Sequence, residues 1–266
     1  MLHKIICVFV FASCRNHFVM SRIVFMKMVH LSNTLKFEIP DGPIGVSCSG
    51  GADSSLLLYI LAKSAPDQLH VYTCACHIKG RRNSLVVPRV IDQVIELTGY
   101  DRIFSHTWYV KEKSISTVFS PQSAALECGQ IKMLFTGVTA NPPLDVVKSF
   151  SNISYEHDSR DPETDRPLRH IDNICTPFTN IDKKFIAKLY HEYGLERSLL
   201  PLTRSCESFE SKDFNGHCQK CWWCEERRWA FGDLAFLLPD DKATWFSTHF
   251  ARRFKRDNKS VNSLDT

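Results

Sequence analysis

Residues 45–55 read Gly45-Val46-Ser47-Cys48-Ser49-Gly50-Gly51-Ala52-Asp53-Ser54-Ser55, and the apolar run Leu56-Leu57-Leu58-Tyr59-Ile60-Leu61 follows. The pattern predicts a buried strand at about 44–47, a tight turn, and a helix from Asp53 to about Lys63. Gly50 and Gly51 allow a sharp bend and the close approach of another group, since neither carries a Cβ atom. Because apolar residues nearly surround the helix, we expect it to lie between a sheet and another element.

The turn places hydroxyl and backbone N–H groups at the start of a helix, where a phosphate or pyrophosphate group binds well. It lacks the Gly-Lys-Ser/Thr of a Walker A loop and the Gly-x-Gly-x-x-Gly of a dinucleotide site. A bare Gly-Gly pair is typical of any strand-to-helix turn, but this string also lies between an apolar strand and an apolar helix. The string Ser-Gly-Gly-x-Asp-Ser resembles the PP-loop of the ATP pyrophosphatases, which split ATP between its α and β phosphates to adenylate a substrate.

The composition is that of an ordinary globular protein rather than a disordered one. The chain has 266 residues, of which 44% are hydrophobic and 23% charged, with a net charge of +4. That charge permits contact with a nucleotide or RNA but does not by itself indicate a nucleic-acid-binding protein. Eleven cysteines are many. Disulfides are one interpretation, but an intracellular enzyme that uses ATP would keep the cysteines reduced, and four of them have the spacing of metal ligands. We therefore expect a cytoplasmic metalloprotein.

The N-terminus has the outline of a short signal peptide, with Lys4 before the apolar run at 5–12. The run is too short to span a bilayer, and the globular pattern begins only near Leu31. An exported ATP-dependent enzyme would have no ATP to use. We therefore expect residues 1–30 to be a disordered extension or the product of an early start codon, rather than an export signal.

Strands and helices alternate after the turn that contains Gly50 and Gly51, which we call the glycine turn. We expect a short edge strand at 35–39, strands at 69–77, 102–110 and 133–136, and helices at 86–98 and from Ser120-Pro121 through Leu126. This alternation predicts an α/β fold, a doubly wound parallel sheet with helices on both faces. Ligands of such folds bind at the carboxyl ends of the strands. The glycine turn, the basic turn at 79–82 and the segment from Gly137 to Asn141 all follow strands, so we expect one pocket there.

Two segments follow the predicted sheet. Residues 145–172 are polar and aperiodic, which fits either a solvated loop or a mobile lid over the site. Thr179-Asn180-Ile181-Asp182 is typical of a helix start, and the helix should run through Tyr193 to Gly194.

Cysteines near the C-terminus have the spacing of a metal site. Cys206, Cys218, Cys221 and Cys224 read C-x11-C-x2-C-x2-C. Two C-x2-C steps place three thiolates on one knuckle, and Cys206 can complete a tetrahedron. A closed four-thiolate shell favours structural Zn²⁺. An iron–sulfur cluster and four unligated thiols are the alternatives, and we expect His170 and His217 to be bystanders.

The PP-loop and the cysteine knuckle together resemble the 7-cyano-7-deazaguanine synthase family. The resemblance extends to Thr176-Pro177-Phe178-Thr179-Asn180-Ile181-Asp182-Lys183 and to Thr203-Arg204-Ser205-Cys206, and spans roughly residues 45–232. It implies an adenine nucleotide alpha hydrolase-like fold with a C-terminal helical zinc-binding segment. It also implies that the protein uses ATP and Mg²⁺ to convert 7-carboxy-7-deazaguanine and ammonia to the nitrile.

The resemblance assigns roles to particular residues. Ser49, Asp53, Ser54 and, less directly, Lys183 would be catalytic, and the four cysteines would bind zinc. The nucleotide would be held by Ser47, Cys48, Ser49, Gly50, Gly51, Ala52, Asp53, Ser54, Ser55 and Gly137.

The chain departs from the family where the purine should bind. The gap after Cys206 is longer, residues 77–82 replace the family's Tyr-Gly-Gln-Arg-His, and 111–132 lack an Arg-Asn signature. The identity of the substrate that accepts the adenylate is therefore an open question. A second hypothesis is another adenylating enzyme, either a tRNA thiolase or an amide-forming ligase. A third is a zinc-binding interaction protein that contacts nucleic acid through Arg227, Arg228, Trp229 and the basic run at 252–256.

We expect four parts: an extension at 1–30, a PP-loop domain at 31–200, a zinc knuckle with C-terminal helices at 201–254, and a polar tail at 255–266. We expect the partners to be a deazapurine carboxylate and ammonia. We do not expect binding to a membrane or to nucleic acid, and the chain could form a homodimer.

Overall fold

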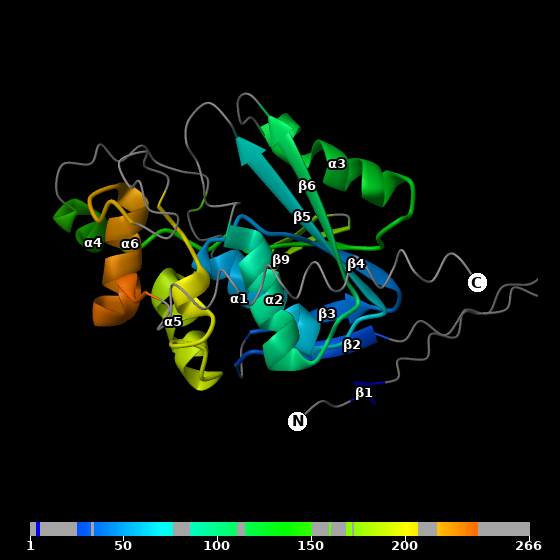
Figure 1. Cartoon of the computed structure of the whole chain (residues 1–266), viewed down its shortest axis with the longest axis horizontal. Coiled ribbons are helices and arrows are strands. Elements are labelled where there is room, and N and C mark those ends of the chain that lie inside the picture. The colour runs from blue at the N-terminus through cyan, green and yellow to red at the C-terminus, as the bar shows by residue number, and fades with distance from the viewer. Residues whose placement is uncertain are drawn as a thin grey trace, which may run out of the picture.

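The computed structural model describes residues 4–5, 26–32, 35–76, 86–110, 115–150, 160, 169–171, 173–206 and 217–238. Its centre is a six-stranded sheet with the strand order β6-β5-β4-β7-β9-β8 (Figure 1). The first five strands are parallel, and β8 is antiparallel to β9. The bounds are β4 (Pro43–Ser47), β5 (Gln68–Cys76), β6 (Ile103–Val110), β7 (Leu134–Thr136), β8 (Arg169–Ile171) and β9 (Ile174–Thr176).

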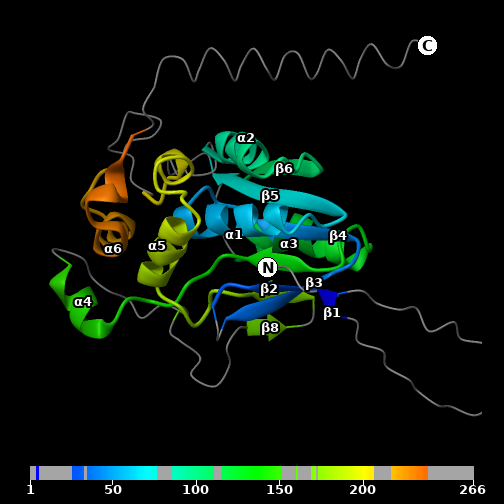
Figure 2. The same ribbon diagram turned by 90° about the horizontal axis from the view of Figure 1, so that it is seen from below.

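Helices cover both faces of this sheet, as the alternating pattern predicts. Helices α1 and α2 pack on the face that carries Ile44 and Val71, and α3 packs on the opposite face, over Tyr72 and Leu134. Helices α4, α5 and α6 gather at one end of the molecule (Figures 1 and 2). The bounds are α1 (Ala52–Lys63), α2 (Val87–Thr98), α3 (Ile115–Glu127), α4 (Leu144–Ser149), α5 (Lys183–Glu192) and α6 (Trp222–Phe231), with short 3₁₀ turns η2 (Leu200–Leu202) and η3 (Gly232–Phe236).

Helix α1 is buried almost throughout, as expected for a helix between the sheet and other helices. It contacts β4, β5, α2 and α5. Leu56, Leu57, Leu58 and Leu61 are completely buried, and burying one leucine side chain stabilises a fold by roughly 1.5–3 kcal/mol. The strand-turn-helix unit is therefore the centre of the core. Among the described residues, the helices are all too short or too polar to traverse a lipid bilayer.

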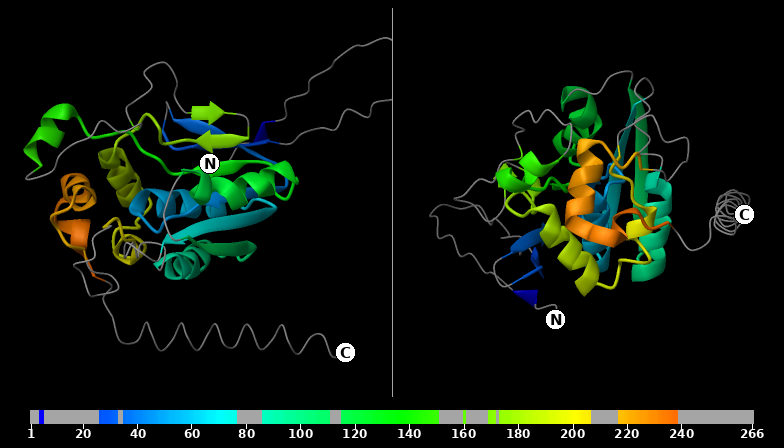
Figure 3. Two further views of the ribbon diagram at one scale, coloured as in Figure 1. Left: turned by 90° about the horizontal axis from the view of Figure 1, so that it is seen from above. Right: turned by 90° about the vertical axis from the view of Figure 1, so that its left-hand side faces the viewer.

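A second, antiparallel sheet lies beside the first. It has the order β1-β2-β3, with bounds β1 (Lys4–Ile5), β2 (Met26–His30) and β3 (Lys36–Pro40). Figures 2 and 3 show it next to β8, and the ring of Phe37 packs on that of Phe135 with 5.7 Å between centroids. The strand expected at 35–39 thus exists but lies outside the main sheet. Met26–His30, which the sequence pattern assigns to the extension, is part of the fold because Val29 is buried with the core.

Three other elements differ from the sequence-based expectations. Helix α3 begins at Ile115 rather than at Ser120, so Pro121 lies inside it; the side-chain amide of Gln122 donates to the carbonyl of Val118 at 2.8 Å in the same turn. The polar segment 145–172 contains α4 at one end and β8 at the other. The basic turn at 79–82 and the tail at 255–266 lie outside the described residues.

Two histidines pair beneath α3 on the neighbouring strands β5 and β6. His70 Nδ1 and His106 Nε2 are 2.9 Å apart, and the rings stack with 5.1 Å between centroids. Burial lowers the pKa of both histidines, and the charge of His106 further lowers that of His70. The folded protein therefore favours the neutral pair.

This pair makes stability depend on pH. Because the pKa values are lower in the folded state, the stability that the neutral pair provides is fully present above the unfolded value of about 6.5 and is lost as the pH falls below it. We expect the free energy of unfolding, measured with urea, to fall between pH 7.5 and 5.5. This fall should be smaller in His106→Gln than in the wild-type protein. Equal slopes in the two proteins would contradict this reading.

Candidate functional site

The glycine turn lies at the carboxyl end of β4, the central strand of the sheet. Ser47 ends the strand beside Tyr72 of β5 and Thr136 of β7, and α1 begins at Ala52. Gly50 has a φ of 83°, in the left-handed region that suits glycine. The turn therefore has the predicted conformation and lies at the predicted edge of the sheet.

Two serine hydroxyls shape the turn. Ser54 Oγ accepts a hydrogen bond from the N–H of Ser49 at 3.2 Å and donates to the carbonyl of Gly51 at 3.3 Å. The hydroxyls of Ser49 and Ser54 are 3.3 Å apart. Ser49 is exposed, whereas Ser54 is buried. Ser49 thus presents its hydroxyl to solvent at the N-terminus of α1, where the helix dipole favours an anion.

Not every residue predicted to hold a nucleotide presents its side chain. Those of Cys48, Ala52 and Ser55 are buried in the core, and burial raises the pKa of the Cys48 thiol. The carbonyl of Ala52 accepts a hydrogen bond from the hydroxyl of Tyr190 at 2.9 Å. These three residues can contribute to a site only through their backbone.

Gly137, after β7, touches the start of α1. A Cβ atom at this position would lie 2.8 Å from the Cα and 2.9 Å from the nitrogen of Ser54. Such distances are shorter than any normal contact, and the neighbouring atoms belong to the backbone, so they cannot move aside cheaply. Because Gly137 has no side chain, the loop after β7 can approach the start of α1. This supports placing Gly137 in the same site as the glycine turn.

Lys183 joins this site from α5. It is the first residue of that helix, after the N-cap Asp182, whose side chain accepts a hydrogen bond from the N–H of Phe185 at 3.0 Å. Its ammonium group is 3.1 Å from Asp53 Oδ2 and 2.8 Å from Glu226 Oε2. The structure thus brings Lys183 to the turn, although the two are more than 100 residues apart in the chain.

The charges of this cluster determine its protonation. Burial raises the pKa of Asp53, and the charge of Lys183 opposes that effect. Burial by itself lowers the pKa of Lys183, but attraction first from Asp53 and then from Glu226 outweighs it, so the pKa lies above its usual value. Lys183 is therefore a cation at neutral pH. Asp53 Oδ1 is buried and has no hydrogen-bond partner among the described residues.

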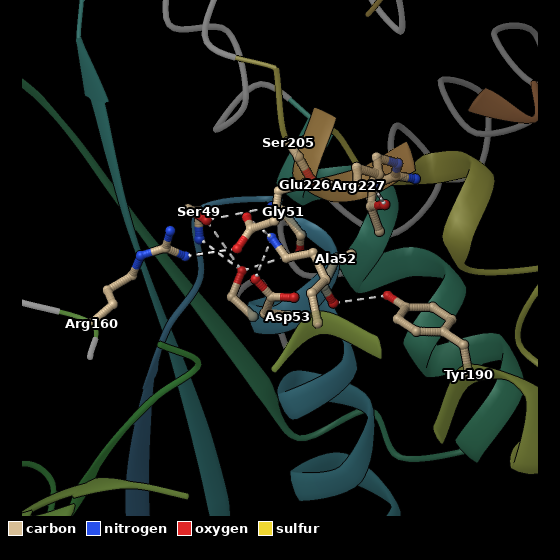
Figure 4. Close-up of polar contacts among 12 residues, drawn as sticks. Ser49, Gly51, Ala52, Asp53, Arg160, Tyr190, Ser205, Glu226 and Arg227 are labelled. Atoms are coloured by element: carbon tan, nitrogen blue, oxygen red, sulfur yellow. Dashed lines mark hydrogen bonds and ion pairs between the residues drawn. The ribbon is translucent and has the colours of Figure 1, made fainter. Parts of the chain in front are cut away.

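Sequence reasoning missed Glu226 and Arg160. Glu226 is completely buried on α6 and also lies 3.1 Å from Arg160. Figure 4 shows Arg160 reaching Glu226 beside the turn. The backbone carbonyl of Arg160 accepts a hydrogen bond from the N–H of Asn141 at 3.0 Å. Nothing local in the sequence marks these two residues, because the burial of Lys183, which calls for more than one counter-ion, is visible only in the structure.

The four predicted cysteines come together at the start of α6. Their sulfur atoms all lie within 4.8 Å of one another, with 3.9 Å between Cys218 and Cys224 and 4.0 Å between Cys206 and Cys221. Four thiolates that share one tetrahedral Zn²⁺ at about 2.3 Å stand about 3.8 Å apart. The group is therefore able to hold a metal ion. His217 instead accepts a hydrogen bond from the N–H of Ser205 at 3.4 Å, as expected of a bystander.

Arg227 joins the cysteine group to the core and is not a surface residue. Its guanidinium is completely buried and donates to Thr203 Oγ1 at 2.9 Å, to Ser205 Oγ at 3.2 Å and to the carbonyl of Leu200 at 3.1 Å. Burial lowers its pKa to about 10. Arg227 is therefore unavailable to nucleic acid, which corrects the third hypothesis at this position.

A match to a known protein family lies in the C-terminal half of the chain. Residues 164–235 match the family model described as "Queuosine biosynthesis protein QueC". In this segment the chain is QueC-like. The QueC-like segment contains α5 with Lys183, all four cysteines, and Glu226 on α6; the glycine turn lies outside it.

Comparisons with curated proteins and with solved structures say less about the function. None of the curated proteins matches the chain, whereas 30 chains of solved structures do. One is the U34-tRNA thiolase NcsA from Methanococcus maripaludis with its [4Fe-4S] cluster, which is 16% identical with a TM-score of 0.35. The match covers 57% of this chain and 56% of that one. A likeness at this level carries no functional argument.

The contact at Gly137 predicts how two glycine substitutions differ. Gly137→Ala should lower the free energy of unfolding by about 1–3 kcal/mol, because the methyl group would push against the backbone of α1. Gly51 has ordinary extended geometry, and a Cβ there would come no closer than 3.5 Å to a neighbour. Gly51→Ala should therefore leave stability unchanged or raise it slightly. Urea unfolding checks both, and the reverse order would contradict the described packing.

The cysteine group predicts that a bound metal stabilises the protein. The purified protein should contain about one metal ion per chain. Cys224→Ser should lose it and lower the Tm by more than about 5 °C, since each kcal/mol lowers the Tm of a chain of this size by roughly 2–4 °C. Cys128→Ser, at an exposed cysteine outside the group, is the control. A metal-free protein with an unchanged Tm in Cys224→Ser would contradict the assignment.

Proposed function

We propose that the protein is an ATP-dependent synthase that adenylates a carboxylate, and that its substrates are 7-carboxy-7-deazaguanine and ammonia. The observation that carries the proposal is the meeting of Lys183, from the QueC-like segment, with Asp53 of the glycine turn at 3.1 Å. Neither segment by itself indicates this chemistry as strongly, because a glycine turn is common and the family match does not include it. Their contact supports one site built from both.

The turn offers groups suited to pyrophosphate. The exposed Ser49 lies just before the N-terminus of α1, and the ammonium of Lys183 is 3.1 Å from Asp53 in the first turn of that helix. Anions bind well at such helix starts. The orphan oxygen Asp53 Oδ1 is a suitable ligand for Mg²⁺, which binds carboxylates together with phosphate oxygens. When bound, Mg²⁺ would neutralise charge on the leaving pyrophosphate.

The reaction that the resemblance implies needs positioning more than covalent help. A carboxylate oxygen of the acceptor attacks the α-phosphorus, and the bond to the bridging oxygen of pyrophosphate breaks. Ammonia then attacks the acyl adenylate and AMP leaves, which gives an amide; a second activation and the loss of water give the nitrile. Fixed donors around the phosphates supply most of the rate in such transfers.

The metal would be structural zinc. The sulfur–sulfur distances of 3.9 and 4.0 Å fit thiolates that share a single ion, whereas thiolates bound to separate irons of a cluster stand further apart. Four cysteine ligands leave no open position for a substrate. The ion would hold α6 against the segment that ends at Cys206.

The substrate assay tests this function. Wild-type protein incubated with ATP, ammonia and 7-carboxy-7-deazaguanine should give the nitrile, detected by mass spectrometry. Ser49→Ala and Asp53→Asn should each lower kcat by about 10²–10³. The first removes a hydroxyl donor to the phosphates, and the second removes the carboxylate charge that would hold Mg²⁺ and Lys183 beside them. Asp67→Asn, at an exposed carboxylate far from the turn, is the matched control.

Other outcomes would point elsewhere. Product formed only from tRNA and a sulfur donor would favour the thiolase hypothesis and overturn the proposed acceptor. Full activity in Asp53→Asn would show that the turn does not carry the chemistry.

A further inference from the structure

A chain of short contacts connects the cysteine group with the glycine turn. Glu226 lies two residues after Cys224 on α6 and is completely buried. Its carboxylate is 2.8 Å from the ammonium of Lys183, which in turn is 3.1 Å from Asp53 in the first turn of α1. Charged groups thus connect α6, α5 and α1, and the backbone of α6 links Glu226 to Cys224 of the cysteine group.

A second connection runs through the backbone before Cys206. The N–H of Arg204 donates to the carbonyl of Gly50 at 2.8 Å, inside the glycine turn. Arg227 holds the same segment through the hydroxyls of Thr203 and Ser205. Two consecutive residues of α6 (Figure 4) therefore support the turn by different routes: Glu226 acts through Lys183, and Arg227 acts through Thr203 and Ser205.

Glu226 has no evident role except to hold Lys183 and Arg160. It is not one of the four residues that can ligate the metal, and none of its surface is exposed. Its charge and that of Asp53 balance those of Lys183 and Arg160. Removing one partner of such a buried set leaves an uncompensated charge and is strongly destabilising for the remaining groups. The position of Lys183 therefore depends on Glu226.

We propose that Glu226 is a positioning residue that couples the metal site to the nucleotide loop. Metal bound by the cysteines fixes the start of α6, and Glu226 then holds Lys183 at the place where the phosphates arrive. Because linkage is reciprocal, a nucleotide that engages Lys183 must strengthen metal binding by the same factor. The coupling rests on the proposed function, since it requires that the turn bind ATP.

The test measures zinc affinity by competition with a chelator, in the absence and presence of α,β-methylene-ATP. In the wild-type protein the analogue should raise the zinc affinity about tenfold, within the usual range of coupling between sites. Glu226→Gln keeps the shape of the side chain and removes its charge. It should weaken analogue binding about tenfold in calorimetry and abolish the effect of the analogue on zinc affinity.

Glu225→Gln is the matched control, because Glu225 is the adjacent residue of α6 and pairs with Arg228 at 2.8 Å, away from the turn. It should behave as the wild type does. If Glu226→Gln does not fold, as judged by circular dichroism, Glu226→Asp serves instead: it keeps the charge but withdraws the carboxylate from Lys183 by one methylene. The linkage should then fall in the same direction.

The outcomes separate the two proposals. A wild-type protein that binds no analogue overturns the proposed function and the coupling with it. A wild-type protein that binds the analogue without any change in zinc affinity overturns the coupling alone. Linkage that persists undiminished in the Glu226 variant would arise from general stabilisation of the fold, and it would also overturn the role of Glu226.

Discussion

The buried ammonium group of Lys183 joins three helices at the carboxyl edge of the sheet. A cation taken out of water must be matched by nearby opposite charge, and here the match comes from Asp53 on α1 and Glu226 on α6. Lys183 itself begins α5. If any of the three residues left this cluster, a buried charge would remain without its partner. The helices that carry them are therefore fixed relative to one another and to the glycine turn.

This arrangement explains why the site lies where it does. The parallel sheet brings the ends of β4 and β7 together, and the missing side chain of Gly137 allows the loop after β7 to touch the first turn of α1. The charged cluster then closes the same edge from the side of the C-terminal helices. A glycine turn by itself is a common feature. The lysine beside it and the cysteine group on the helix that carries Glu226 are the reasons why we propose the adenylation of a carboxylate.

Local patterns were enough to predict the elements whose residues interact within a short stretch. The apolar run after Gly51 predicts α1, the cap at Asp182 predicts α5, and the two C-x2-C steps predict the cysteine group. Helix α3 was placed too late because proline favours the first turn of a helix, whereas Pro121 lies inside this one. Strands β8 and β9 have only three residues each, too few for alternation to be visible.

The charged core of the site could not be predicted in the same way. Glu226 and Arg227 belong to a run of four charged residues, Glu225 to Arg228, and such a run usually marks a solvated helix face. Their burial depends on partners more than 20 residues away in the chain, namely Lys183, Thr203 and Ser205. The same holds for Met26–His30, whose role appears only when it pairs with Lys36–Pro40.

We propose that the glycine turn serves a reaction at the α-phosphorus of ATP. Phosphorus-31 NMR of ATP incubated with the wild-type protein, ammonia and the carboxylate acceptor shows directly which bond breaks. We expect AMP and pyrophosphate to appear together, and only when the acceptor is present. ADP and orthophosphate as the products would contradict it.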